Sequence, residues 1–268
     1  MNISYGLTDQ LTPITSLTGI TLSIPERLKL ETSLDQLQQD IKCDEIYFWG
    51  KILGTEKDYY IALAIYFKDH KYFPLKRFYF SQSTNFAFSE LPSIHNHHLP
   101  FFRKHNTYFI GNPDIILEKF ISKEKNLTEG DRLSYVVRKI DSETSLLPVG
   151  SVKLLPNKEL RLNDNFEGLT QEEITDMKSF CLFRKIRTKE KYESVLTGNA
   201  VFDFNFMDSV DNEVYWRKQI DEGTHMIVNI RSLVWPGYYF YHIANTKQYG
   251  GMYYGYGIKN EDIEFLLG

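Results

Sequence analysis

The histidines are the first candidates for chemistry, because His95, His97 and His98 lie within four residues and His105 follows nearby. Imidazole nitrogens bind zinc, but a zinc site built on one short segment usually needs ligands from a second element. No cysteine, and no paired aspartate and histidine, has a spacing that would supply them. A solvated polar loop is the simpler interpretation, so we expect neither a metal nor a cofactor here.

The usual signatures of nucleophilic and nucleotide chemistry are missing. The sequence has no G-x-S-x-G motif, no G-x-x-x-x-G-K-[ST] loop and no complete dinucleotide fingerprint. Cys43 and Cys181 fall in or beside expected helices, which favours small core residues over catalytic thiols. The Glu172–Glu173 pair is unremarkable among 35 acidic residues. We expect a protein that is not an enzyme, and the remaining catalytic alternative is an unrecognised hydrolase that uses His242 or the histidines of 95–98.

Composition points to a globular protein with much β-structure. Of its 268 residues, 42% are hydrophobic and 15% are aromatic, and aromatic residues favour strands. The net charge of −4 argues against a nucleic-acid-binding protein, which would carry a basic patch. The chain shows no signal peptide and no apolar run of roughly 20 residues that could span a membrane. With only two cysteines, a soluble protein of a reducing compartment is expected.

The C-terminal stretch of residues 227–260 predicts three strands with turns between them. The strands are expected at 227–233, 238–243 and 252–256, where β-branched and aromatic residues gather. Trp235, Pro236 and Gly237 break the run, and this order fits a type II turn with proline second and glycine third. The glycine-rich segment YGGMYYGYG also allows an alternative, a cytosolic module that binds a peptide or carbohydrate in an aromatic cleft.

The rest of the chain predicts an α+β fold of mainly antiparallel sheets, a few helices and an aromatic-rich core. We expect one domain over residues 1–268, in which residues 1–22 are an extended arm that orders on a partner. Helices are expected at 24–41, 132–140, 170–183 and 189–196, and further strands at 45–53, 59–67, 76–80 and in a hairpin over 152–162.

Strand alternation predicts a surface that a partner would cover. Tyr238 and Phe240 should face one side of their strand and Tyr239 and Tyr241 the other, so both sides need burial. One side should pack on helices and the other on a second sheet or protein, since aromatic residues are enriched at interface centres. The expected contact residues are Tyr47, Trp49, Tyr239, Tyr241 and Tyr253.

Five stretches also carry a family resemblance. They are DEIYFWGKILGTEKDYYIA from Asp44, NFEGLTQEE from Asn165, FMDSV from Phe206, RSLVWPGYYFYH from Arg231 and MYYGYGIKNEDIEFLL from Met252. Together they resemble the radial spoke head 9 branch of the radial spoke 4/6/9 family of motile cilia. Residues 68–130 match this pattern poorly.

The resemblance implies a structural subunit of the radial spoke head in the 9+2 axoneme. It implies packing with radial spoke head proteins of the 4/6 type, with proteins 1 and 10 nearby. It also implies that the head faces the central pair apparatus and helps to relay signals toward the dynein arms during ciliary movement. Localisation would be the axoneme, with a cytoplasmic pool before assembly.

Overall fold

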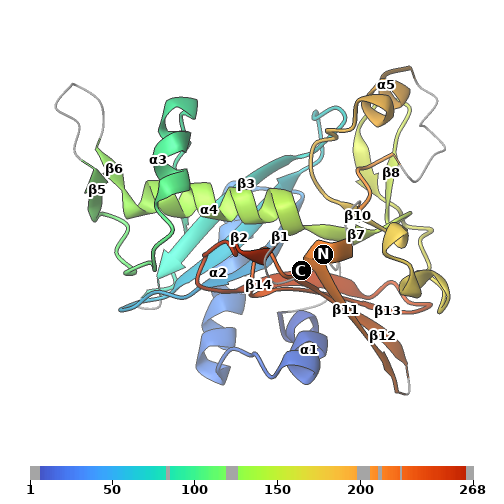
Figure 1. Ribbon diagram of the computed structural model, residues 1–268, viewed down its shortest axis with the longest axis horizontal. Coiled ribbons are helices and arrows are strands. Elements are labelled where there is room, and N and C mark those ends of the chain that lie inside the picture. Colours follow the sequence, from blue (N-terminus) through green and yellow to red (C-terminus); the bar gives the residue numbers. More distant parts are fainter. Residues whose placement is uncertain are drawn as a thin grey trace.

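One mixed sheet of eight strands carries the fold (Figure 1). The computed structural model describes residues 7–82, 85–118, 126–197, 206–210, 213–223 and 225–263. The strand order is β11-β12-β13-β14-β1-β2-β3-β4, so strands from the two ends of the chain meet in the middle of the sheet. The bounds are β1 Glu45–Ile52, β2 Tyr59–Tyr66, β3 Leu75–Gln82, β4 Ser89–Glu90, β11 Trp216–Glu222, β12 Met226–Ser232, β13 Tyr238–Ile243 and β14 Tyr249–Gly255.

Helices lie on both faces of this sheet. Figure 1 shows α1 and α2 on one side and the long helix α4 on the other. The helices are α1 Leu7–Thr18, α2 Ile24–Ile41, α3 Leu99–Lys104, α4 Glu129–Thr144 and α5 Lys189–Thr197. Three small two-stranded sheets complete the fold, formed by β5 Ile116–Glu118 with β6 Leu127–Thr128, β7 Leu146–Pro148 with β10 Phe180–Leu182, and β8 Val152–Leu154 with β9 Leu160–Leu162. The expected α+β class is confirmed.

Capping boxes start both long helices. Ser23 and Glu26 exchange side-chain and backbone hydrogen bonds at the start of α2, and Thr128 and Asp131 do so at α4. These contacts satisfy backbone N–H groups that have no partner inside the helix. Because the box of α4 begins at Thr128, this helix starts three residues before the expected Arg132 and buries most of its first half.

A helix expected over residues 170–183 is wrong. Its capping box, Thr170 with Glu173, is present, but only two short 3₁₀ turns follow, at Glu173–Thr175 and Met177–Ser179. Asp176 between them is extended, with φ −98° and ψ 125°, and residues 180–182 then pair with β7. Two consecutive 3₁₀ turns bury Ile174 and Met177 three residues apart, which imitates the spacing of a helical face.

The sheet separates two hydrophobic cores, and β13 divides its aromatic residues between them. Tyr238 and Phe240 belong to the core on the α4 side, as alternation predicts. Tyr241 belongs to the core on the α1 and α2 side, with Tyr239 packed against it. Ile14 of α1 and Leu30 of α2 cover that second side. The chain therefore supplies its own cover for a face that we expected a second sheet or a partner to bury.

Residues 7–18 form α1, where an extended arm was expected, while residues 1–6 lie outside the described residues. Among the described side chains of this helix, Ile14 is the buried one. The helix contacts β13 and α2. Gly19, with φ +72°, follows its last residue. An amphipathic segment gains stability mainly by packing its apolar face, and the aromatic sheet face provides that surface within the same chain.

The strands β1 and β14 are parallel and join the two halves of the sheet. Gly50 pairs with Tyr253, Lys51 with Tyr254 and Ile52 with Gly255. Gly50 has φ +150°, and a Cβ added there would lie 2.1 Å from the carbonyl oxygen of Tyr253. Only glycine allows these two backbones to approach so closely.

We expect Gly50→Ala to destabilise the protein by about 2–4 kcal/mol, because it combines backbone strain with a steric clash at the join. Urea unfolding followed by circular dichroism measures this loss. Gly223→Ala is the matched control, since its added Cβ would meet nothing closer than 3.7 Å. Equal midpoints for both variants would show that the join tolerates a side chain.

Candidate interaction surface

His242, the histidine in the C-terminal strands, is a buried structural residue. It has no exposed surface, and the Leu169 N–H donates to its Nε2 at 3.0 Å. Its Nδ1 therefore carries the proton and donates to the Gln248 carbonyl oxygen at 2.9 Å. Burial lowers the pKa of His242 to about 4. Both ring nitrogens are occupied, so the imidazole holds the Leu169 segment to the sheet and has no free atom for catalysis.

The histidines of 95–98 lie on a short 3₁₀ turn, Asn96–His98, before α3. The rings of His97 and His98 are 3.8 Å apart, and His95 stacks on His97 at 5.6 Å. His105 instead contacts Phe101, with ring centroids 3.9 Å apart. In the parts of the chain that the structure describes, no three histidine, cysteine, aspartate or glutamate side chains come together as a metal site requires.

The two thiols have the properties of packing groups. Cys181 is buried in the core, where its Sγ donates to the Leu147 carbonyl oxygen at 3.5 Å. Burial raises the pKa of Cys181 to about 12 and that of Cys43 to about 11. Because the thiolate is the reactive form, neither sulfur is activated as a nucleophile at neutral pH.

Buried carboxylates tie helices and loops to the sheet. Asp141 of α4 accepts from the ammonium group of Lys76 at 2.7 Å and from Nε1 of Trp49 at 3.4 Å. Glu129, at the start of the same helix, accepts from the Tyr59 hydroxyl at 2.7 Å and from the backbone N–H groups of residues 110–112. Each carboxylate is satisfied by neighbouring donors, as buried charges must be. These groups hold the fold. Asp141 also lines a cavity of about 50 Å³ with Trp49 and Leu146, but both of its carboxylate oxygens already accept from donors of the chain.

A third ion cluster joins α2 to β1. The ammonium group of Lys51 lies 3.0 Å from Glu26 and 2.9 Å from Asp58, and the Tyr60 hydroxyl also donates to Glu26. Burial would raise the pKa of Glu26, but hydrogen bonds from Tyr60, Ser23 and Lys51 outweigh it and lower this pKa to about 2. The carboxylate therefore stays ionised, and the residue that caps α2 also anchors this helix to the sheet.

The segment at Trp235, Pro236 and Gly237 forms a tight turn beside the C-terminal segment. The Tyr238 N–H donates to the Trp235 carbonyl oxygen at 3.1 Å, and Gly237 has φ +105°. The indole is buried, and its Nε1 donates to Glu143 of α4 at 2.7 Å. A Cβ at Gly237 would lie 2.4 Å from the Tyr254 carbonyl oxygen. The turn thus locks α4, β13 and β14 together.

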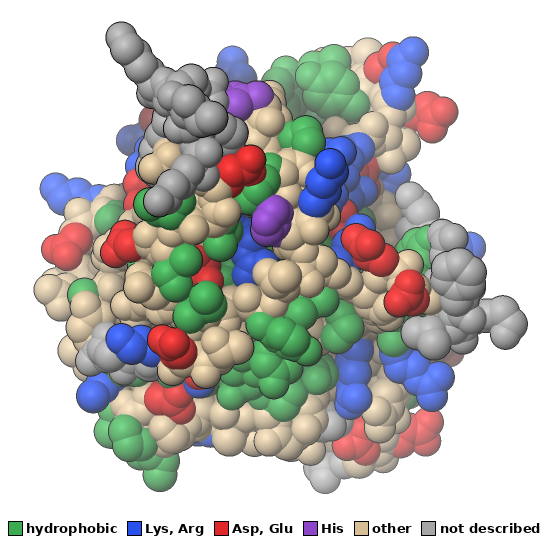
Figure 2. All heavy atoms as spheres, turned by 60° about the vertical axis from the view of Figure 1, so that its left-hand side comes forward, with side chains coloured by type: hydrophobic (Ala, Val, Ile, Leu, Met, Phe, Trp, Pro, Cys, Tyr) green, Lys and Arg blue, Asp and Glu red, His purple; other side chains and the backbone are tan. Residues whose placement is uncertain are grey.

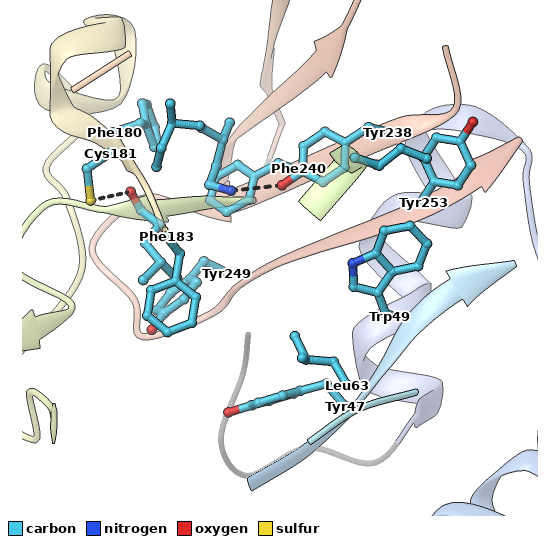
Figure 3. Packing of buried hydrophobic residues seen from close by; sticks show 14 of the residues in the cluster. Tyr47, Trp49, Leu63, Phe180, Cys181, Phe183, Tyr238, Phe240, Tyr249 and Tyr253 are labelled. Atoms are coloured by element: carbon cyan, nitrogen blue, oxygen red, sulfur yellow. Dashed lines mark hydrogen bonds between the residues drawn. The ribbon is translucent and has the colours of Figure 1, made fainter. Parts of the chain in front are cut away.

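Four of the five expected contact residues are covered by the chain itself. Figure 3 shows Tyr47, Trp49 and Tyr253 among the buried side chains of the α4-side core. Tyr241 lies under α1 and α2 and is 1% exposed. Tyr239 keeps partial exposure beside the Arg231 guanidinium, 5.5 Å from its ring. The rings of Tyr47, Trp49, Tyr241 and Tyr253 therefore contact other parts of the same chain, because helices cover both faces of the sheet.

The glycine-rich segment YGGMYYGYG likewise builds core more than cleft. Tyr249 and Tyr253 are buried, and Gly250 lies against the ring of Tyr241, with 3.0 Å from its added Cβ to Cε1. Tyr256 is the most exposed tyrosine of the segment, since half of it is exposed. An aromatic cleft is therefore not formed by this segment alone.

Sequence reasoning missed two exposed aromatic residues that lie near the C-terminal end of α3. Tyr108 is 58% exposed and Tyr256 is 51% exposed, and their rings meet edge to face with centroids 5.1 Å apart. Figure 2 shows one face of the molecule, on which hydrophobic side chains gather in separate areas among acidic and basic groups. The available signal was alternation, since Tyr108 precedes the buried Phe109 and Tyr256 lies between two glycines.

We expect the stability of the protein to fall as the pH drops from about 6.5 to about 4. The unfolded imidazole of His242 binds a proton in this interval, whereas the folded one stays neutral until about pH 4. The contribution is complete above pH 6.5 and its loss amounts to about 3 kcal/mol. Chemical unfolding at a series of pH values measures it. His242→Gln should flatten this slope, and the same change at exposed His95 should leave it intact. An unchanged slope in His242→Gln would contradict the assignment.

Within the described residues, no helix combines the length and apolar character needed to cross a membrane. The model of the family of radial spokehead-like proteins matches residues 8–74. The radial spoke head protein 9 homologue of Homo sapiens is 32% identical over 268 residues, which cover 93% of this chain and 94% of the relative. The Bos taurus homologue is 33% identical over 269 residues, and that of Danio rerio 28% over 268, with the same coverage.

The human and bovine relatives are thus at least 32% identical to this chain over 93% of its length. The chain belongs to the radial spoke head protein 9 family.

Proposed function

We propose that this protein is a non-catalytic structural subunit of the radial spoke head in the axoneme of a motile cilium. The observation that carries the proposal is the similarity to radial spoke head protein 9 homologues over 93% of the chain. The arrangement of titratable groups supports it, since His242, Asp141 and Glu129 each hold one element against another.

The way in which these groups are used supports a non-catalytic role. An active site needs a nucleophile or base that faces a cavity, with a perturbed pKa that suits the reaction. Here the lowered pKa of His242 and the raised pKa of Cys181 result from burial, and their hydrogen bonds go to backbone groups of the same chain. Perturbation of this kind serves packing.

Membership of the family extends the proposal to partners. The subunit would pack with 4/6-type radial spoke head proteins, with proteins 1 and 10 in the same head, and help to assemble that head. The head would face the central pair apparatus and relay mechanical signals toward the dynein arms. A sheet joined through its centre and clamped by helices on both faces suits a rigid load-bearing part. A cytoplasmic pool before assembly belongs to the same proposal.

Fractionation of cilia tests the assignment. We expect the tagged chain to stay with axonemes through a salt wash and to leave them with other spoke head proteins when the complex is extracted. Cross-linking of the extract followed by mass spectrometry should connect it to a 4/6-type subunit.

Two variants serve as controls for this experiment. Gly223→Ala should be retained in axonemes like the wild type, whereas Gly50→Ala should be depleted because its fold fails at the central join. Recovery of the folded wild-type chain in the detergent-soluble fraction of cilia, unconnected to spoke proteins, would refute the structural role.

A further inference from the structure

Buried contacts fix the two chain segments that carry the exposed Tyr108 and Tyr256 near the C-terminal end of α3. Phe109 has no exposed surface, and a Cβ at its neighbour Gly257 would lie 2.8 Å from the Phe109 ring. The Arg132 guanidinium stacks 3.8 Å above the same ring, while one of its terminal nitrogens donates to the Thr107 carbonyl oxygen at 2.8 Å. The backbones that carry Tyr108 and Tyr256 are thus held by buried contacts, so a ligand would not have to order them.

A groove opens beside the exposed tyrosine pair. It has a volume of about 450 Å³ and is lined by Tyr108, Tyr256, Pro236 and Ile258, with polar groups from Asn106 and residues 259–262. Asn106 Nδ2 donates to the Lys259 carbonyl oxygen at 3.3 Å and closes one part of its wall. The lining therefore combines flat aromatic and apolar surfaces with amide groups.

The rim of this groove carries two acidic side chains. Glu261 and Asp262 are both exposed there. Among the described residues that line it, Lys259 is the one cation, and it is engaged with the Glu143 carboxylate at 3.5 Å and lies 6.0 Å from the Trp235 ring. The carboxylates of Glu261 and Asp262 can attract a positively charged ligand.

From this geometry we infer that the groove docks an extended, proline-rich segment of a partner protein that carries arginine or lysine next to its prolines. A polyproline II helix needs no hydrogen bonds from a sheet edge and packs its rings against aromatic side chains. Neighbouring tyrosines and a proline offer such a surface, and Glu261 and Asp262 supply charge complementarity for a flanking cation. The inference does not depend on the radial spoke assignment, because its test uses the isolated full-length chain.

The direct test is fluorescence anisotropy with three labelled peptides. The first has eight prolines preceded by two arginines, the second replaces the arginines by glutamates, and the third replaces the prolines by alternating alanine and serine. We expect saturable binding of the first peptide and at least tenfold weaker binding of the other two. Equal binding of all three, or no binding of the first, overturns the inference.

Variants locate the binding to this groove. Tyr108→Ser combined with Tyr256→Ser should weaken binding of the arginine peptide at least tenfold, because both stacking surfaces are lost. Tyr192→Ser removes a tyrosine of similar exposure on α5 and should bind like the wild type. Glu261→Gln with Asp262→Asn should remove the preference for arginine over glutamate while leaving proline recognition. Melting temperatures verify that each variant is folded, and wild-type affinity in the folded double tyrosine variant contradicts the site.

Discussion

The parallel pairing of β1 with β14 is the contact on which the rest of the structure depends. It comprises three residue pairs, and it joins four strands from the first third of the chain to four from the last. Backbone hydrogen bonds between segments so far apart in sequence close a very long loop, whose entropy must be offset by the packing that the join permits. Gly50 makes the approach possible, and the Trp49 ring, 5.5 Å from that of Tyr253, covers it from the α4 side.

Charged groups then fix how the helices sit on the joined sheet. Asp141 and Glu129 lie at opposite ends of α4, and each binds donors from the N-terminal strands or the loop that follows them. Glu26 does the same for α2 through Lys51. A buried ion pair contributes little net free energy compared with apolar packing, but removal of one partner is costly. We interpret these buried ion pairs and hydrogen bonds as the contacts that select one arrangement of the helices. Packing against aromatic rings of similar size would by itself specify that arrangement less strictly.

The use of the buried polar groups for internal contacts bears on function. The His242 imidazole and the Cys181 thiol, which the sequence offers as candidates for catalysis, are committed to internal contacts. What the molecule offers to others is its outer surface, which includes the exposed Tyr108–Tyr256 pair. A protein organised in this way is suited to the structural role proposed above.

The sequence by itself determined the local elements of this protein. A capping box and apolar spacing placed α2, apolar spacing placed the middle of α4, and alternation in β13 correctly divided Tyr238 from Tyr241. It also determined the family, because five motifs keep their order along the chain. Local patterns failed at residues 170–183, where 3₁₀ turns share the spacing of a helix, and at β11, whose charged edge positions hide a strand.

Only the tertiary structure decided which surfaces remain open. The sequence predicted Tyr241 and Tyr253 to be interface residues. Its local patterns do not show that Tyr241 packs on the α1 side and Tyr253 on the α4 side of the sheet. The exposure of Tyr108 and Tyr256, in contrast, depends on Phe109 and Gly257 meeting across 147 intervening residues. Strand order, the β1–β14 join and the groove beside it arise from contacts between distant segments. Alternation tells which residues share a face of a strand, but the competition among all apolar surfaces of the folded chain decides which face is covered.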